Sequence, residues 1–208
     1  MKTRLGIHAL LGSAIAVTTW AAAGTFAGAQ TPLAIDSARI TISGTSNIHS
    51  YTASTTTVRV RRAQLADGLQ GADLWTGALK PGGVEAFEVV VPAASLTSPR
   101  EGLDKNMHKA LQVADHPEIA FRLLRIEAGP GATGALRAVG VLRIAGVERE
   151  VSFEITTERK GSLLGVEGRI ALLMTDFGIK PPTAMLGMLK TDPKVIVAFE
   201  TVLTVPLT

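Results

Sequence analysis

The chain has 208 residues, including 21 Lys and Arg, 18 Asp and Glu, and no Cys. The lack of cysteine excludes disulfide bridges, thiol catalysis and thiolate zinc sites, so the burial of apolar side chains must supply the stability of the fold. The aromatic residues are too few and too scattered to predict a base-stacking platform for nucleic acid.

Residues 1–29 have the pattern of a secretory signal peptide. Lys2 and Arg4 precede an apolar run over residues 5–23, and an A-x-A cleavage pattern ends before Gln30. An uncleaved membrane anchor is the weaker alternative, because Gly, Thr and His dilute the run. Removing two of the 21 basic residues and none of the 18 acidic ones leaves 19 and 18, so the pI of about 9.4 indicates neither a nucleic-acid partner nor an anionic membrane. We predict a periplasmic protein in which residues 30–208 form one domain.

Three strands are expected in the first half of the chain. Alternating apolar and polar residues predict the first over residues 33–43, and a run rich in Thr and Val predicts the second over 49–62. The third covers residues 84–91. The intervening stretch is rich in Gly and poorly patterned, and we expect a short strand near Leu74 and Trp75 within it.

Residues 98–123 contain the one stretch that predicts a helix. Its apolar residues at helical spacing are Leu103, Met107, Ala110 and Leu111. Ser98 is expected to cap the helix, with Glu101 completing a capping box, although Gly102 favours a regular start only after it. Pro117 prevents the helix from continuing. Because a single amphipathic helix beside a β domain must bury its apolar side, we expect it across an open end or face of the sheet.

Five more strands are predicted over residues 118–128, 134–144, 147–157, 162–175 and 194–205. Ala145 and Gly146 should form one hairpin turn, and residues 176–193 a loop with a helical turn after Pro182. Eight strands, with the helix between the third and the fourth, predict an all-β, eight-stranded antiparallel barrel. Some strands are apolar on both faces, so part of the exterior is expected to be covered; the residues concerned are Leu123, Leu124, Ile126, Leu172, Leu173 and Met174.

Five segments resemble the YceI-like proteins, in the same order along the chain. They are NIHSYTAS at 47–54, FEVVVPAASL at 87–96, LDKNMHKALQVADHPEIAF at 103–121, VGVLRIAGVEREVSFEI at 139–155 and MTDFGIKPPTAMLGMLKTDPKVIVAFE at 174–200. The third and fourth are the most specific, and the resemblance runs from about residue 33 to 205. It implies a lipocalin-like, extended barrel of eight antiparallel strands, exported in bacteria. It also implies an elongated apolar cavity that holds a polyisoprenoid chain or a related amphiphile such as an isoprenoid quinone.

The side chains expected to bind such a ligand are apolar. One phenylalanine lies on each of four strands, at Phe87, Phe121, Phe153 and Phe199, although filling the barrel is the favoured explanation for any one of them. Unbranched thioethers adapt to irregular partners. A helix and a Met-bearing loop are therefore expected to form a compliant lid, with contacts from Met107, Leu111, Met174, Met185 and Met188. The resemblance places His49 near the barrel mouth, where a head group would meet His49, Arg100 or Asp104.

Patterns typical of catalysis and metal binding are missing from the sequence. The spacing of His49, His108 and His116 matches no standard ligand set. The chain has no G-x-S-x-G elbow and no Gly-rich phosphate loop, and the glutamates of residues 147–157 alternate outward instead of forming a facing carboxylate pair. We predict a protein that is not an enzyme, with no catalytic residue, no metal and no cofactor beyond a bound isoprenoid lipid or quinone.

The predicted function is the periplasmic sequestration or transport of an isoprenoid-type lipid inside the barrel. The expected partner is this amphiphilic small molecule and not nucleic acid. Transient contact with a membrane or a membrane protein, and a homodimer, stay open. The alternatives are a stress-related barrel filled by its own side chains that acts through its surface, an enzyme that modifies a lipid or quinone, and a dimeric module that buries Leu124 and Leu173.

Overall fold

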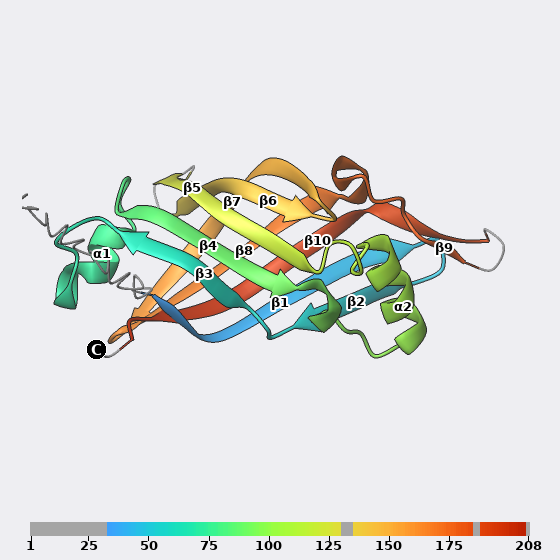
Figure 1. The fold of residues 1–208 in the computed structure, drawn as a ribbon, viewed down its shortest axis with the longest axis horizontal. Helices are drawn as coiled ribbons and strands as arrows, with labels where there is room; N and C mark the ends of the chain where they lie inside the picture. Colours follow the sequence, from blue (N-terminus) through green and yellow to red (C-terminus); the bar gives the residue numbers. More distant parts are fainter. Residues whose placement is uncertain (1–32, 130–134, 185–187, 207–208) are drawn as a thin grey trace, which may run out of the picture. The chain divides into compact units, whose positions relative to one another are not determined.

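The computed structural model describes residues 33–129, 135–184 and 188–206, most of which belong to one antiparallel sheet that curls on itself (Figure 1). The strands are β1 Ala34–Ser46, β2 Ser50–Thr55, β3 Arg59–Leu65, β4 Val84–Pro92, β5 Glu118–Ala128, β6 Leu136–Ile144, β7 Val147–Lys160, β8 Leu163–Leu173, β9 Thr183–Ala184 and β10 Leu189–Thr204. The helical elements are η1 Gly71–Asp73, α1 Leu74–Ala78, η2 Ala93–Ser95, α2 Glu101–Ala110 and η3 Met174–Phe177. Within the described ranges, no helix is both long and apolar enough to cross a membrane.

The strands are ordered β2-β1-β10-β8-β7-β6-β5-β4-β3, and β9 pairs with the start of β10. The two edges, β2 and β3, are consecutive in the chain, and no ladder joins them in the part of the chain that the structure describes. The curl brings β3 close to β1, and an isolated bridge links Ser54 of β2 to Thr97 after β4. The all-β, antiparallel prediction is confirmed. In place of the predicted eight-stranded barrel, the strands form a curled sheet with a seam between β2 and β3.

The break between β2 and β3 accounts for one of the two strands beyond the eight expected, and β9 is the other. A single strand was expected over residues 49–62, but the chain pairs with β1 only as far as Thr55 and then pairs with β4. The buried Thr55 hydroxyl accepts a hydrogen bond from the amide of Thr57 (3.0 Å) and donates one to Ser95 Oγ (2.8 Å). Ser95 Oγ in turn donates to the Pro92 carbonyl (2.7 Å). Threonine side chains stabilise such turns by bonding to nearby backbone, so one Thr-rich segment supplies both edges of the sheet.

The short strand predicted near Leu74 and Trp75 is wrong, because these residues lie in the helix α1. Leu74, Trp75 and Ala78 are buried on one side of it, at a spacing that suits a helix and not an alternating strand. Leu74 and Trp75 pack in a cluster at one end of the sheet; its other buried members are Leu33, Leu164 and Leu203 (Figure 1).

The helix α2 lies at the opposite end of the sheet from α1 (Figure 1). It follows β4 and precedes β5, and it begins after Arg100. The predicted capping box is wrong: the amide of Ser98 donates to Asp104 Oδ1 (2.8 Å) and not to Glu101, and Ser98 Oγ accepts from the amide of Arg100 (3.1 Å). These two bonds fix the extended backbone that leads into the helix.

The apolar side of α2 packs onto the end of the sheet, as its amphipathic pattern predicts. Leu111, just after the helix, is buried in a cluster that also contains Leu96 and Phe177, and Met107 packs against this cluster. His108 Nε2 lies 2.8 Å from the Leu96 carbonyl oxygen and ties the helix to the chain after η2. The helix therefore covers one end of the interior.

The β6–β7 hairpin turns at Ala145 and Gly146, as predicted. Both residues have positive φ, 47° and 78°, as the type I′ turn of a two-residue hairpin requires. A Cβ atom on Gly146 would lie 2.6 Å from the ring of His116. This position therefore requires glycine both for its backbone conformation and for the ring that packs on it.

Parts of the predicted loop over residues 176–193 belong to regular elements. β10 begins at Leu189, earlier than expected, and η3 ends at Phe177. Thr183 and Ala184 form β9 in place of the predicted helical turn after Pro182. Residues 185–187 lie outside the described part of the chain.

Inward-facing side chains alternate along the strands and give the sheet an apolar interior. On β10 they are Val195, Val197, Phe199, Thr201 and Leu203. A β-bulge in β5 places both Leu123 and Ile126 inside and leaves Leu124 outside, 41% exposed. Leu173 is also 43% exposed, so no other part of the described chain covers either of these two leucines fully.

The outer face of the edge strand β3 is held by charge pairing. Arg61 donates from Nη1 to Glu88 of β4 (2.9 Å) and from Nη2 to Glu118 of β5. Both carboxylates raise the pKa of the Arg61 guanidinium. The pairing joins three neighbouring strands across the sheet, next to the seam.

Candidate functional site

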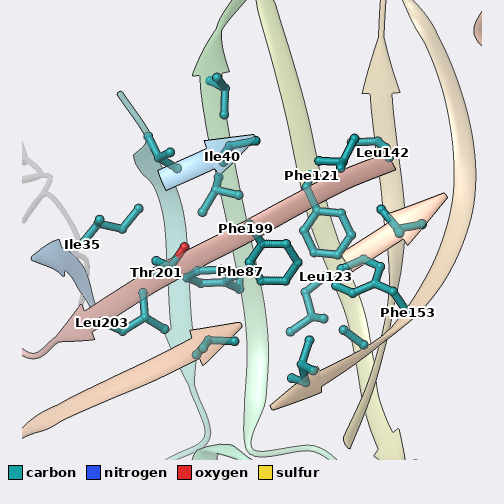
Figure 2. Close-up of a pocket in the computed structure, with 18 of the residues that line it drawn as sticks. Ile35, Ile40, Phe87, Phe121, Leu123, Leu142, Phe153, Phe199, Thr201 and Leu203 are labelled. Carbon is teal, nitrogen blue, oxygen red and sulfur yellow. The ribbon is translucent and has the colours of Figure 1, made fainter. Parts of the chain in front are cut away.

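The curled sheet encloses an inner cavity of about 260 Å³. Side chains from β1, β4, β5, β6, β7, β8 and β10 line it, and the labelled side chains of Figure 2 point into this shared space. Apart from the Thr201 hydroxyl and the indole nitrogen of Trp75, the described lining is hydrocarbon. A cavity with so few polar partners does not hold ordered water well, and it suits an apolar occupant.

Three phenylalanines form a row across the inner cavity. The ring centroids of Phe121 and Phe153 are 5.5 Å apart, and those of Phe153 and Phe199 are also 5.5 Å apart, in the tilted and edge-on geometries that aromatic pairs favour. The intervening strands carry glycine beneath the rings. A Cβ atom on Gly140 would lie 2.5 Å from the Phe121 ring, and one on Gly168 would lie 2.6 Å from the Phe199 ring. The alternation of Phe on β5, β7 and β10 with Gly on β6 and β8 gives these rings space inside the sheet.

Trp75 forms the floor of the inner cavity at the α1 end. Its side chain lines the cavity, only 4% exposed, and its Nε1 donates to the Ser162 carbonyl (2.9 Å) at the β7–β8 turn. Leu33 and Leu79 line the same end. The indole is therefore fixed both by packing and by a hydrogen bond.

A second cavity of about 550 Å³, the mouth cavity, lies at the α2 end of the sheet. It is lined by β1, β2, α2, η3 with the loop after it, and β10. The inner and mouth cavities share the lining residues Ile42, Ile119, Ile144, Leu172 and Val197. The two spaces therefore adjoin, and an apolar interior extends from the Trp75 floor to the mouth.

The β1–β2 turn places His49 at this mouth. Ser46 Oγ donates to the His49 carbonyl (2.8 Å) and accepts from the His49 amide (3.1 Å), which fixes the turn. Arg100, at the start of α2, lies with Nη1 3.0 Å from His49 Nε2. Because a guanidinium can only donate, His49 Nε2 is the acceptor in this contact.

The mouth cavity carries one permanent positive charge. Arg100 supplies it, and no carboxylate is among the described residues that line the cavity. The other polar lining side chains besides His49 and Tyr51 are Ser46, Ser50, Thr52, Asn106, Thr183 and Thr191. Asp104, expected from the sequence as a head-group contact, does not line the cavity and accepts the Ser98 amide instead. The arrangement suits a group that is anionic or rich in hydrogen-bond acceptors.

Tyr51 faces the mouth cavity from β2. Its ring lies over Gly44 of β1, where a Cβ atom would come within 2.3 Å of the Tyr51 hydroxyl oxygen. Burial raises the pKa of the Tyr51 phenol, and the negative charge of Asp192 raises it further. The neutral phenol is therefore favoured in the folded chain.

This raised pKa predicts a loss of stability in alkali. Tyr51 contributes its full stabilisation below the unfolded pKa of about 10, and the contribution is lost as the pH rises through the higher folded pKa. Urea unfolding between about pH 9 and pH 11 should show a steeper loss for the wild type than for Tyr51→Phe. Tyr51 is the only tyrosine in the chain, so tyrosinate absorbance reports its titration directly. Equal slopes for the two proteins, or an ordinary titration midpoint, would contradict this prediction.

The residues predicted to bind ligand fall into two groups around the interior. Phe87, Phe121, Phe153 and Phe199 line the inner cavity, and His49, Met107, Leu111 and Met174 line the mouth cavity. Met188 lines neither cavity and is 67% exposed. Met185 lies outside the described residues, so the lid that both methionines were expected to form stays a prediction. The other two histidines lie elsewhere: His108 bonds to the Leu96 carbonyl, and His116 packs on Gly146.

Among the lining residues that were not foreseen are the aromatic residues Trp75 and Tyr51. Trp75 was assigned to a short strand, because a five-residue helix is too short to show a helical period. Tyr51 was assigned only to the start of a strand, although its aromatic ring and the small Gly44 opposite are a recognisable cross-strand pair once the register is known.

The sequence over residues 14–203 matches the YceI-like domain family. The fold is similar to that of BcnA from Burkholderia cenocepacia, with a TM-score of 0.63 and 12% identity over 79% of this chain and 95% of that one. It is also similar to a polyisoprenoid binding domain from Saccharophagus degradans that is implicated in plant cell wall breakdown. There the TM-score is 0.62, with 11% identity over 85% of this chain and 100% of that one. Identities this low show similarity of fold alone, and no curated protein was found to match.

Proposed function

The chain belongs to the YceI-like domain family, and we propose that it binds an isoprenoid-type lipid, a polyprenyl compound or an isoprenoid quinone, inside its curled sheet. The apolar tail would occupy the inner cavity, and the head group would stay in the mouth cavity. The polyisoprenoid binding domain of similar fold is consistent with this class of ligand.

The observation that carries the proposal is the separation of polarity between the two adjoining cavities. The inner cavity is hydrocarbon apart from Thr201 and the Trp75 nitrogen, whereas the polar groups gather at the other end around His49 and Arg100. An amphiphile with one polar end matches this division. The two unfilled spaces also argue against the alternative in which the protein's own side chains fill the interior.

Burial of the tail supplies enough free energy for binding. Each enclosed CH₂ group is worth about 0.8 kcal/mol, so about ten isoprenoid carbons provide several kcal/mol after ordering costs. No single polar contact has to be strong. A cavity that binds by hydrocarbon burial tolerates variation in the head group, which fits a carrier or a sequestering protein.

The head group that fits best is one that accepts hydrogen bonds. Arg100 provides charge-assisted donors, and a His49 ring that accepts from Arg100 at Nε2 would offer Nδ1–H as a further donor. A phosphate would use both, whereas a quinone carbonyl or an alcohol would use only one of them.

We propose binding without turnover, because His49 Nε2 is already occupied by Arg100 and the inner cavity offers little else for acid–base chemistry. The signal-peptide pattern of residues 1–29, which lie outside the described part, supports a periplasmic location for this activity.

The test is uptake by lipid-free protein of geranylgeraniol and of geranylgeranyl monophosphate. Without residues 1–29, Trp75 is the only tryptophan, so its fluorescence should change when the tail reaches the cavity floor. Wild-type protein should bind one molecule of either compound. Arg100→Gln should weaken binding of the phosphate about tenfold, or about 1.4 kcal/mol, and leave the alcohol nearly unchanged.

Lys105→Gln is the matched control, since Lys105 is exposed on the same helix and does not line the mouth cavity. If neither compound binds to the wild type, the proposed function is wrong. If Arg100→Gln and Lys105→Gln affect the phosphate equally, the tail assignment stands but the head group does not meet Arg100.

A further inference from the structure

Exposed large apolar side chains concentrate at the mouth end of the sheet. Among the residues that the structure describes, the large hydrophobic side chains that are exposed are Ile48 (60%), Leu173 (43%), Met188 (67%) and Leu124 (41%). Leu173 lines the mouth cavity, Ile48 lies in the β1–β2 turn that holds His49, and Met188 immediately precedes β10. Only Leu124 lies away from the mouth, on the outer wall at the β5 bulge.

Asn47 joins the two turns that carry Ile48 and Met188. Its side-chain amide donates to the Met188 carbonyl (2.8 Å), and its side-chain oxygen accepts from the Lys190 amide (2.8 Å). Its own backbone amide donates to the Lys190 carbonyl (3.1 Å). Three hydrogen bonds therefore tie the backbone of the two turns together, and the turns carry Ile48 and Met188 side by side at the mouth.

Cationic side chains lie beside the apolar residues at this end. Segments 46–52 and 177–191 contain Lys180 and Lys190 but no Asp or Glu. Both lysines are exposed, and Arg100 adds a third cation across the mouth. Two exposed carboxylates, Asp176 and Asp192, flank segment 177–191, and the charge of Asp192 acts on Tyr51. Exposed apolar side chains bordered by cations fit an anionic lipid surface better than they fit water.

We propose that Ile48, Leu173 and Met188, the apolar rim, dock the mouth cavity onto a bilayer that contains anionic lipid. Ile48 and Met188 enter the acyl boundary, and Lys180 and Lys190 remain at the level of the lipid phosphates. The inference rests on the proposed function, because it gives the lipid a path from the membrane into the mouth cavity that does not cross water. The apolar rim and its neighbouring lysines form a surface for an anionic partner, although the overall charge of residues 30–208 is close to balanced.

Docking through a few side chains is weak and reversible, as a carrier requires. Substituting Ile48 and Met188 by Ser should therefore lower vesicle partitioning measurably without affecting the fold, since neither side chain is buried. The expected loss for the pair is at least about tenfold. Leu124→Ser removes an exposed leucine of comparable accessibility from the outer wall, and it should have no effect on partitioning.

The experiment is flotation of the protein purified from its own host with vesicles of phosphatidylcholine, with and without phosphatidylglycerol. We expect binding to the mixed vesicles, the large loss for Ile48→Ser/Met188→Ser, no loss for Leu124→Ser, and a weaker dependence on phosphatidylglycerol for Lys190→Gln. Equal partitioning of Leu124→Ser and the double variant, or no binding by the wild type, overturns the docking surface.

A separate readout distinguishes this result from failure of the proposed function. Ile48→Ser, whose side chain lines neither cavity, should take up free geranylgeraniol as the wild type does, while it receives geranylgeraniol from vesicles more slowly. If the wild type floats with vesicles but takes up no geranylgeraniol, the lipid-binding proposal fails and the docking surface stands. If uptake is normal and transfer from vesicles is equal in both proteins, the docking surface has no role in loading and the inference fails.

Discussion

Val197→Trp is expected to weaken binding of a long prenyl chain by about 100-fold and to spare a short one. Val197 lines both cavities from β10, with Ile42 opposite on β1 and Ile170 opposite on β8. An indole at this position fills the junction through which a tail must pass. Excluding even a few isoprenoid carbons from the inner cavity removes more than the 2.8 kcal/mol or so that corresponds to 100-fold in affinity. Calorimetric titration with geranylgeraniol and with the much shorter geraniol measures both effects.

The control for this prediction is the next residue on the same strand. Ala198 is exposed on the outer face, so Ala198→Trp adds the same ring to β10 without entering either cavity. Overpacking at Val197 should cost about 1–3 kcal/mol of stability, which urea unfolding detects, and the variant must be compared under conditions where it is fully folded. If folded Val197→Trp bound geranylgeraniol as tightly as Ala198→Trp does, the tail would not run through the junction.

Most strands could be predicted from the local sequence pattern, because apolar and polar residues alternate along a strand that buries one face. The β6–β7 hairpin is the clearest case, with its turn at Ala145 and Gly146 placed correctly. The seam was not predictable in the same way. It is accompanied by a hydrogen bond between Thr55 and Ser95, which are 40 residues apart, and a continuous run of Thr and Val gives no local sign of this bond.

The inside of the sheet was easier to predict than its mouth. One phenylalanine per strand pointed to the interior, and all four line the inner cavity. The mouth depends on turns from distant segments, such as the Arg100 side chain that meets His49 from the start of α2. Residue type alone could not place Met188, which is 67% exposed and lines neither cavity, and the lid stays a prediction.

Trp75→Ala is expected to cause the largest loss of stability in the chain. Trp75 is only 4% exposed, it packs with Leu74 and Leu33, and truncation of a buried Trp costs about 3–5 kcal/mol. For a domain of this size that corresponds to a fall in Tm of roughly 10 °C. Trp75→Phe keeps an aromatic floor but leaves the Ser162 carbonyl without the indole N–H, so it should cost only about 1–2 kcal/mol. Differential scanning calorimetry of the three proteins without ligand gives the comparison.

The same substitution should change ligand selection in the direction opposite to Val197→Trp. Removing the indole deepens the inner cavity at the α1 end, so Trp75→Ala should favour longer prenyl chains over geranylgeraniol relative to the wild type. Val197→Trp blocks the cavity at its entrance, whereas Trp75→Ala extends its floor, and the two effects require the tail to lie along the axis between them. Chain-length profiles measured by mass spectrometry of bound lipid, from a mixture of polyprenols, test this directly. If Trp75→Ala lost stability as expected but kept the wild-type profile, the tail would end short of the floor, and the inner cavity would serve packing at that end and not length selection.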